Sequence, residues 1–160
     1  MLTAQLYTFG RNADFVAELE KARVRFMIVG GLAVVFHGCR DPSNVDDLDI
    51  LLDPSPGNAE RFATLMLSVL PGANITASQL AKPKVQMPVK RDYLLDVLTP
   101  PPEFSFSELD SRAEVAILNG STRVRVIGRA DLAAMKRLAV ASVGKDLAKH
   151  QNDLQCLEAV

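Results

Sequence analysis

Hydrophobic and polar residues follow two kinds of pattern along the chain, and each pattern predicts one kind of element. Apolar residues recur at helical spacing in residues 11–22 and 59–70. Asn12 is the expected N-cap of the first segment, and Pro71-Gly72 ends the second. Both segments are therefore predicted to be amphipathic helices that pack one face against a core.

Short apolar runs predict strands over residues 25–29, 45–52, 84–89 and 93–98. Between the first two, residues 32–36 favour a short helix and residues 39–44 have the composition of a turn. Residues 113–118 and 122–127 flank Asn119-Gly120, a strong signal for a hairpin.

Helical patterns over residues 131–140 and 145–157 predict two C-terminal helices, separated near residues 142–144. Neither an internal repeat nor a linker composition divides the chain. The prediction is one α+β or α/β domain over residues 1–160, with a helical tail over residues 129–160.

Composition and cysteine content restrict the class of protein. Of 160 residues, 48% are hydrophobic and 23% charged, as in globular proteins. The longest apolar run, residues 26–36, is shorter than the ~20 residues of a membrane span, and the first residues lack a signal-peptide pattern. Cys39 and Cys156 make neither a disulfide framework nor a paired metal motif, so reduced thiols and a cytoplasmic location are expected.

The net charge is only −1, but the charges are unevenly distributed. Residues 41–60 hold six acidic side chains and no Lys or Arg, whereas residues 121–150 hold seven Lys or Arg and two Asp. Two interpretations stay open: two solvated faces that attract each other weakly, or an acidic metal-binding edge that faces a phosphate-binding basic arm. The basic residues within 82–91 could contact RNA phosphates, but such a run more often forms a solvated edge.

Candidate phosphate- and metal-binding residues lie at the end of the first predicted strand and near the start of the second. Side chains alternate along a strand, so Asp47 and Asp49 are expected on one face, with Asp46 pointing away. Two neighbouring carboxylates suit a hard cation such as Mg²⁺. The strand that ends at Gly30-Gly31 leads into a helix, whose free N–H groups favour a phosphate. The glycine pair matches neither the P-loop nor the dinucleotide-binding fingerprint.

The segments VGGLAVVFHG and DDLDILL together resemble the signature of the DNA polymerase beta-like nucleotidyltransferase superfamily. The similarity is to its small bacterial branch, the minimal nucleotidyltransferases and AbiEii-type toxins. Residues 93–98 resemble the strand with the third carboxylate, residues 129–137 the helix with a lysine, and residues 145–154 the closing helix. The resemblance implies a small nucleotidyltransferase fold, a mixed β-sheet flanked by helices.

The resemblance also implies roles for individual residues. Asp47 and Asp49 would hold a metal on the triphosphate, and Asp96 would help to bind a second Mg²⁺ and draw the proton from the attacking hydroxyl. Gly30 and Gly31 would cradle phosphate, and Lys136 would neutralise charge on the nucleotide. All of these residues are polar or small types that also occur for structural reasons.

Structural alternatives therefore stay open for several residues. Asp96 is also explained as the cap of a neighbouring turn, and Lys136 as an exposed helix lysine. His37 is expected to be a packing or hydrogen-bonded histidine. His150 and Asp153 are expected to form a surface pair on one helix face.

The function implied by the resemblance is Mg²⁺-dependent transfer of an NMP from an NTP to a macromolecular acceptor, tRNA or a partner protein. A toxin–antitoxin system, with a cognate antitoxin or toxin partner, is the implied context, and no membrane partner is expected. One alternative is a catalytically silent regulatory module with the same fold that binds nucleotide or a partner. Another alternative is a small antibiotic as the acceptor.

Overall fold

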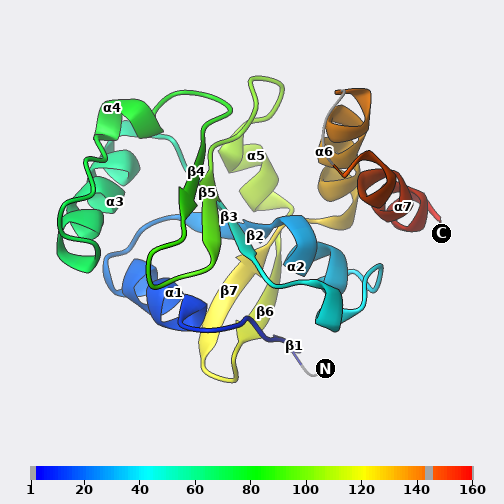
Figure 1. Cartoon of the computed structure of the whole chain (residues 1–160). Helices are drawn as coiled ribbons and strands as arrows, with labels where there is room; N and C mark the ends of the chain where they lie inside the picture. The colour runs from blue at the N-terminus through cyan, green and yellow to red at the C-terminus, as the bar shows by residue number, and fades with distance from the viewer. Residues whose placement is uncertain (1–2, 143–145, 160) are drawn as a thin grey trace.

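The structure, a computed structural model of the chain, describes residues 3–142 and 146–159 (Figure 1). The strands are β1 Ala4–Leu6, β2 Phe26–Val29, β3 Leu48–Leu52, β4 Gln86–Val89, β5 Leu95–Leu98, β6 Glu114–Leu118 and β7 Thr122–Val126. The helices are α1 Asn12–Lys21, α2 Gly30–Phe36, α3 Pro56–Val69, α4 Ala77–Leu80, α5 Phe106–Ser111, α6 Arg129–Ala141 and α7 Leu147–Glu158, with a 3-10 turn over Pro42–Asn44. The predicted break at Val143 and Gly144, like Lys145, lies outside the described residues.

All seven strands form one mixed sheet in the order β1-β6-β7-β2-β3-β5-β4. The central strand β2 runs antiparallel to β3 and parallel to β7, and β3 runs parallel to β5. In Figure 1, α1, α3 and α4 lie on one side of the central strands, and α6 and α7 lie on the other. The predicted α/β fold, a mixed sheet flanked by helices with a helical C-terminal part, is confirmed.

Burial explains why the central elements follow the hydrophobic pattern. All four residues of β2 are buried, as its unbroken apolar run predicts. The ring of Phe15 on α1 packs edge-on against Phe62 of α3 and Tyr93, with centroids 6.4 and 5.2 Å apart. The apolar faces of both helices thereby close the core beside the sheet.

Asn12 has a different role from the predicted one. Arg11 is the N-cap of α1, and Asn12 is buried inside the first turn. The Asn12 side chain accepts a hydrogen bond from Leu94 N at 2.8 Å and donates one to Leu94 O at 3.0 Å. The capping prediction is wrong because the Asn12 amide pairs with the backbone of Leu94, just before β5, instead of with the start of α1.

Three short elements, β1, α4 and α5, lie where the hydrophobic pattern predicts neither helix nor strand. The three residues of β1 pair with β6, a partner more than 100 residues away in sequence. The two helices begin at side-chain caps, Thr76 for α4 and Ser105 for α5. The strand predicted over residues 45–52 begins only at Leu48, after the 3-10 turn and its extension.

The prediction of two reduced thiols is wrong: Cys39 and Cys156 form a disulfide, with their Cα atoms 5.6 Å apart. The bond joins the loop after α2 to the last turn of α7, across 117 positions of sequence. Spacing along the chain carries no signal for such a contact, because the packing of α7 creates it. Within the two described stretches, no helix has the length and apolar character that crossing a bilayer requires.

Candidate functional site

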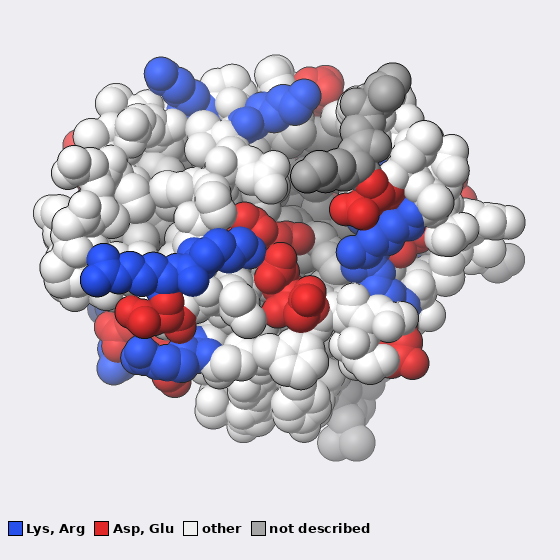
Figure 2. All heavy atoms as spheres, in the orientation of Figure 1, with Lys and Arg blue, Asp and Glu red and all other residues white. Residues whose placement is uncertain are grey.

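A cleft with a volume of about 470 Å³ opens beside the junction of β2 and α2. Its lining includes all six residues that the sequence analysis singles out, namely Gly30, Gly31, Asp47, Asp49, Asp96 and Lys136. Figure 2 shows acidic side chains gathered near the centre of one face, with basic side chains to both sides. The fold thus brings residues of α2, β3, β5 and α6 to one place.

The carboxylates meet because β3 and β5 are parallel neighbours. Asp49 of β3 lies directly opposite Asp96 of β5 in the register of the sheet. Asp47 precedes β3 by one residue. Burial, and after it the negative charges of Asp96 and Asp47, raise the pKa of Asp49 from 3.8 to about 6. The floor of the cleft is therefore an acidic cluster that favours a bound proton or cation.

Lys90 supplies a cation to this cluster. Its Nζ lies 3.2 Å from Asp47 Oδ2 and 3.3 Å from Asp96 Oδ2. Partial burial acts to lower the pKa of Lys90, but the hydrogen bonds to the two carboxylates outweigh it and raise the pKa. Lys90 is exposed, as the predicted solvated edge implies, but it also reaches over the acidic floor from the loop after β4.

Gly30 and Gly31 allow other side chains to approach the start of α2 closely. A Cβ atom on Gly30, whose φ is +64°, would lie 1.9 Å from Asp49 Oδ2. A Cβ atom on Gly31 would lie 2.6 Å from a guanidinium nitrogen of Arg40. Glycine is required at Gly30 by both the backbone and this contact. The glycine pair therefore positions a carboxylate and a guanidinium beside the first N–H groups of the helix.

Lys136 is buried, so its interpretation as an exposed surface lysine is wrong. Its Nζ lies 2.9 Å from Asp153 Oδ2 and 3.0 Å from His150 Nδ1, both on α7. Burial lowers the pKa of Lys136, and the Asp153 carboxylate opposes this effect. Burial and the Lys136 ammonium lower the pKa of His150. The predicted surface pair of His150 and Asp153 is instead part of a buried charge cluster.

Arg40 is a member of the site that the sequence did not point to, and Asp153 has a role other than the predicted surface pair. Their side chains form an ion pair in which both are almost fully buried, 9% and 5% exposed. The Asp153 carboxylate thus joins two cations, Arg40 and Lys136. The resemblance of residues 145–154 to a closing helix indicated the segment but not this role of Asp153.

The structure also decides the alternatives for three other residues. Asp46 lines the cleft, contrary to the prediction, because strand parity does not apply before β3 begins. The Asp96 carboxylate accepts a hydrogen bond from Lys90 and, within residues 3–142 and 146–159, none from the backbone of a turn. His37 Nε2 lies 2.8 Å from the carbonyl oxygen of Ile127, as expected of a hydrogen-bonded histidine.

The acidic floor fits a cation without forming a closed metal site. In the part of the chain that the structure describes, no three His, Cys, Asp or Glu side chains make a ready metal-binding group. Asp47 and Asp96 nevertheless both contact the Lys90 ammonium, so one cation bridges their oxygens. A set of carboxylate oxygens is the donor set that Mg²⁺ prefers, particularly with phosphate oxygens completing the coordination.

The fold is that of the nucleotidyltransferase-like proteins. A solved structure of an antigenic nucleotidyltransferase-like protein from Paracoccidioides brasiliensis matches 91% of this chain and 72% of its own, with a TM-score of 0.52 and 15% identity. At this identity the likeness concerns the fold, and it supports the predicted nucleotidyltransferase architecture. No family model matches the sequence, and no curated protein matches it either.

Proposed function

We propose that the protein is a Mg²⁺-dependent nucleotidyltransferase of the small bacterial branch, which moves an NMP from an NTP to a macromolecular acceptor. One observation carries the proposal: Asp49 and Asp96 lie side by side on parallel strands, with Asp47, on the floor of a cleft whose opposite wall is basic. Such a cleft suits a substrate that combines a triphosphate with divalent cations.

Asp47 and Asp49 are the proposed ligands of the cation on the triphosphate, and Asp96 is the proposed ligand of a second one. Bound there, Mg²⁺ would offset the negative charge on the phosphates and favour departure of pyrophosphate. Asp96 is also proposed to accept the proton of the attacking hydroxyl. The Asp96 side chain is 14% exposed, so an acceptor would have partial access to it.

The basic wall is proposed to hold the phosphates. Lys136 and Lys149 both line the cleft, and Lys149 is exposed. Asp153 Oδ2 lies 2.9 Å from Lys136 Nζ and so fixes the position of the ammonium at the cleft. The first N–H groups of α2, at Gly30 and Gly31, would complete the phosphate contacts.

A second cavity of about 500 Å³ adjoins the cleft and is the proposed place for part of the acceptor. The two share Val29, Gln86, Leu98, Met135 and Ala139. Leu98 follows Asp96 by two residues on the same face of β5, so an acceptor group in this cavity would lie near the proposed base. We propose tRNA or a protein as the acceptor, in a toxin–antitoxin context with a cognate partner.

The silent regulatory module remains a second candidate, and one observation favours it. Lys90 is already paired with Asp47 and Asp96, and Lys136 with Asp153, so part of the charge of the cleft is compensated by its own side chains. A protein that only binds nucleotide or a partner does not need its carboxylates free to hold metal ions for transfer, so these pairs are compatible with a silent module.

The test is incubation of the protein with each α-labelled NTP, Mg²⁺ and total RNA or cell lysate. A labelled RNA or protein band that is absent with Asp49→Asn supports transfer. Melting temperatures test the second candidate. A melting temperature that rises only with NTP and Mg²⁺ together, without a labelled RNA or protein band, supports the silent module. No label and no rise at millimolar NTP and Mg²⁺ contradict both the enzyme and a module that binds nucleotide.

A further inference from the structure

The last helix, α7, forms one wall of the cleft although it is the final element of the chain. Lys149 and His150 of α7 line the cleft, and Asp153 of α7 holds Lys136. The geometry of the basic wall thus depends on α7 staying docked against α6 and the loop after α2.

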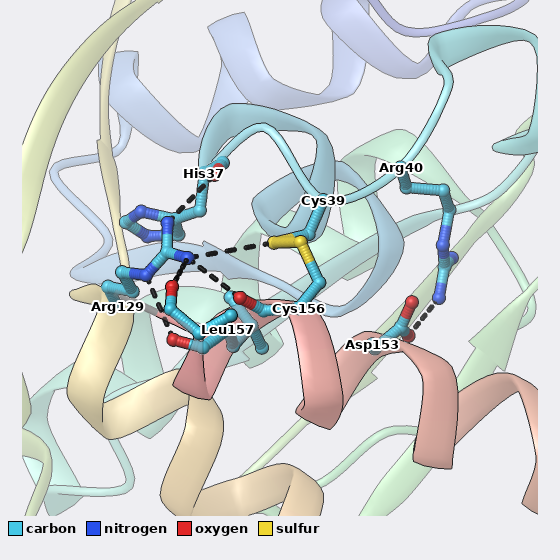
Figure 3. Close-up of a disulfide and its surroundings, with 8 residues drawn as sticks. His37, Cys39, Arg40, Arg129, Asp153, Cys156 and Leu157 are labelled. Atoms are coloured by element: carbon cyan, nitrogen blue, oxygen red, sulfur yellow. Dashed lines mark hydrogen bonds and ion pairs between the residues drawn. A yellow bond between two sulfur atoms is a disulfide. The ribbon is translucent and has the colours of Figure 1, made fainter.

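Noncovalent contacts at the end of α7 converge on Arg129, as Figure 3 shows. The Arg129 guanidinium donates to Leu157 O at 2.9 Å, Cys156 O at 2.9 Å and His37 O at 3.0 Å. The same side chain therefore ties α7 to the loop after α2, where Cys39 lies. The buried Leu157 side chain adds apolar contact.

We propose that the Cys39–Cys156 disulfide is a redox-controlled link that keeps α7 in place as the wall of the cleft. Oxidised, the bond joins the last turn of α7 covalently to the loop after α2 (Figure 3). Reduced, α7 is held by noncovalent contacts: the Arg129 hydrogen bonds, the ion pairs of Asp153 with Arg40 and Lys136, and buried side chains. This proposal concerns the wall itself and holds whether or not the chain transfers nucleotides.

The surroundings suit reduction by a dithiol. Cys39 and Cys156 both keep partial exposure to solvent, so a small dithiol has access. A guanidinium nitrogen of Arg129 lies 3.9 Å from Cys39 Sγ, and a nearby positive charge stabilises a thiolate. Attack of the reductant thiolate on Cys156 Sγ would therefore release Cys39 as the better leaving group.

A dithiol reduces the Cys39–Cys156 bond in two thiol–disulfide exchange steps. The first thiolate of the dithiol forms a mixed disulfide with Cys156 and releases Cys39. The second thiolate of the dithiol then displaces Cys156, leaving two protein thiols and an oxidised, cyclic dithiol. Two electrons and two protons pass from the dithiol to the protein, and a disulfide oxidant reverses the exchange.

Amide hydrogen exchange on the whole chain, before and after reduction with dithiothreitol, tests the proposal. After air oxidation, thiol titration should find no free thiol, and after reduction it should find both cysteines. Exchange in α7 should then become at least about tenfold faster, while exchange in β2 and β3 stays unchanged. The matched control, Cys156→Ser, should exchange like the reduced protein and be insensitive to dithiothreitol.

Three results would overturn the proposal. The first is two free thiols in the air-oxidised protein, and the second is unchanged exchange in α7 after complete reduction. The third is faster exchange that extends equally through β2 and β3, which would make the bond a general staple of the fold. If Cys156→Ser does not fold, the reduced natural chain carries the test alone.

Discussion

Replacing Asp49 with asparagine should stabilise the metal-free protein at neutral and alkaline pH. The reason is that the ionised Asp49 carboxylate is buried and faces the charges of Asp96 and Asp47. Asparagine has nearly the same shape and no charge, so the variant removes the repulsion and keeps the packing against Gly30. The same substitution should abolish nucleotidyl transfer if Asp49 is a metal ligand.

The size of the effect follows from the pKa of Asp49, which rises from 3.8 to about 6 on folding. Since each tenfold preference between protonation states is worth about 1.4 kcal/mol, the ionised side chain costs the folded state up to about 3 kcal/mol. A raised carboxyl pKa means that the folded state binds its proton more tightly than the unfolded state. The natural protein therefore loses this stability as pH rises from about 4 through about 6, and the variant does not.

Urea unfolding in EDTA at pH 4 and pH 8 measures the difference. The free energies of unfolding should nearly agree at pH 4, and the variant should exceed the natural protein by up to about 3 kcal/mol at pH 8. The matched control is Asp53→Asn at the other end of β3, where the carboxylate pairs with Arg25 at 3.3 Å. This control should lose stability at pH 8. A difference for Asp49→Asn that is the same at both pH values would refute the argument.

Three further changes test other contacts of the site. Lys136→Met should weaken NTP binding in titration calorimetry by about 1.5–3 kcal/mol. Its effect on the free energy of unfolding in urea should be smaller, because Arg40 still pairs with Asp153. An unchanged NTP affinity would argue against a phosphate contact. Lys90→Ala should bind Mg²⁺ more tightly in a metal titration, since the competing ammonium is gone; weaker binding would contradict the competition. Gly30→Ala should lower the free energy of unfolding by about 1–3 kcal/mol, because its φ of +64° and its contact with an Asp49 oxygen both oppose a Cβ atom; an unchanged urea midpoint would contradict this.

The sequence predicts the central part of the fold because burial there leaves a strong local pattern. The unbroken apolar run of β2 and the apolar faces of α1 and α3 follow directly from their positions in the core. The edge strand β1 leaves no such pattern, because its three residues depend on a distant partner, β6. Asn12 is misread for a related reason: a capping residue and a buried asparagine have the same sequence signature.

The candidate site likewise contains residues that the sequence predicts and residues that it does not. Asp47 and Asp49 stand two residues apart and both line the cleft, although Asp47 precedes β3 and strand alternation does not govern it. The resemblance adds Asp96 from a strand that the register then sets beside Asp49. Arg40, Asp153 and the disulfide were not predictable by such means, because each pairs residues more than 100 positions apart. These contacts exist only once α7 docks, and they are the contacts that form the basic wall.

The paired charges of the cleft have a consequence for binding order. Lys90 compensates part of the negative charge of the floor, and Asp153 part of the positive charge of the wall, so each side keeps an excess of one sign. Free Mg²⁺ must displace an ammonium, and a free triphosphate would approach uncompensated carboxylates. A triphosphate with its bound Mg²⁺ meets both sides with opposite charge at once, replacing the internal pairs by equivalent external ones. If the cleft binds nucleotide as proposed, these charges should favour the metal–nucleotide complex over either component, while the pairs with Lys90 reduce the repulsion between the carboxylates of the floor.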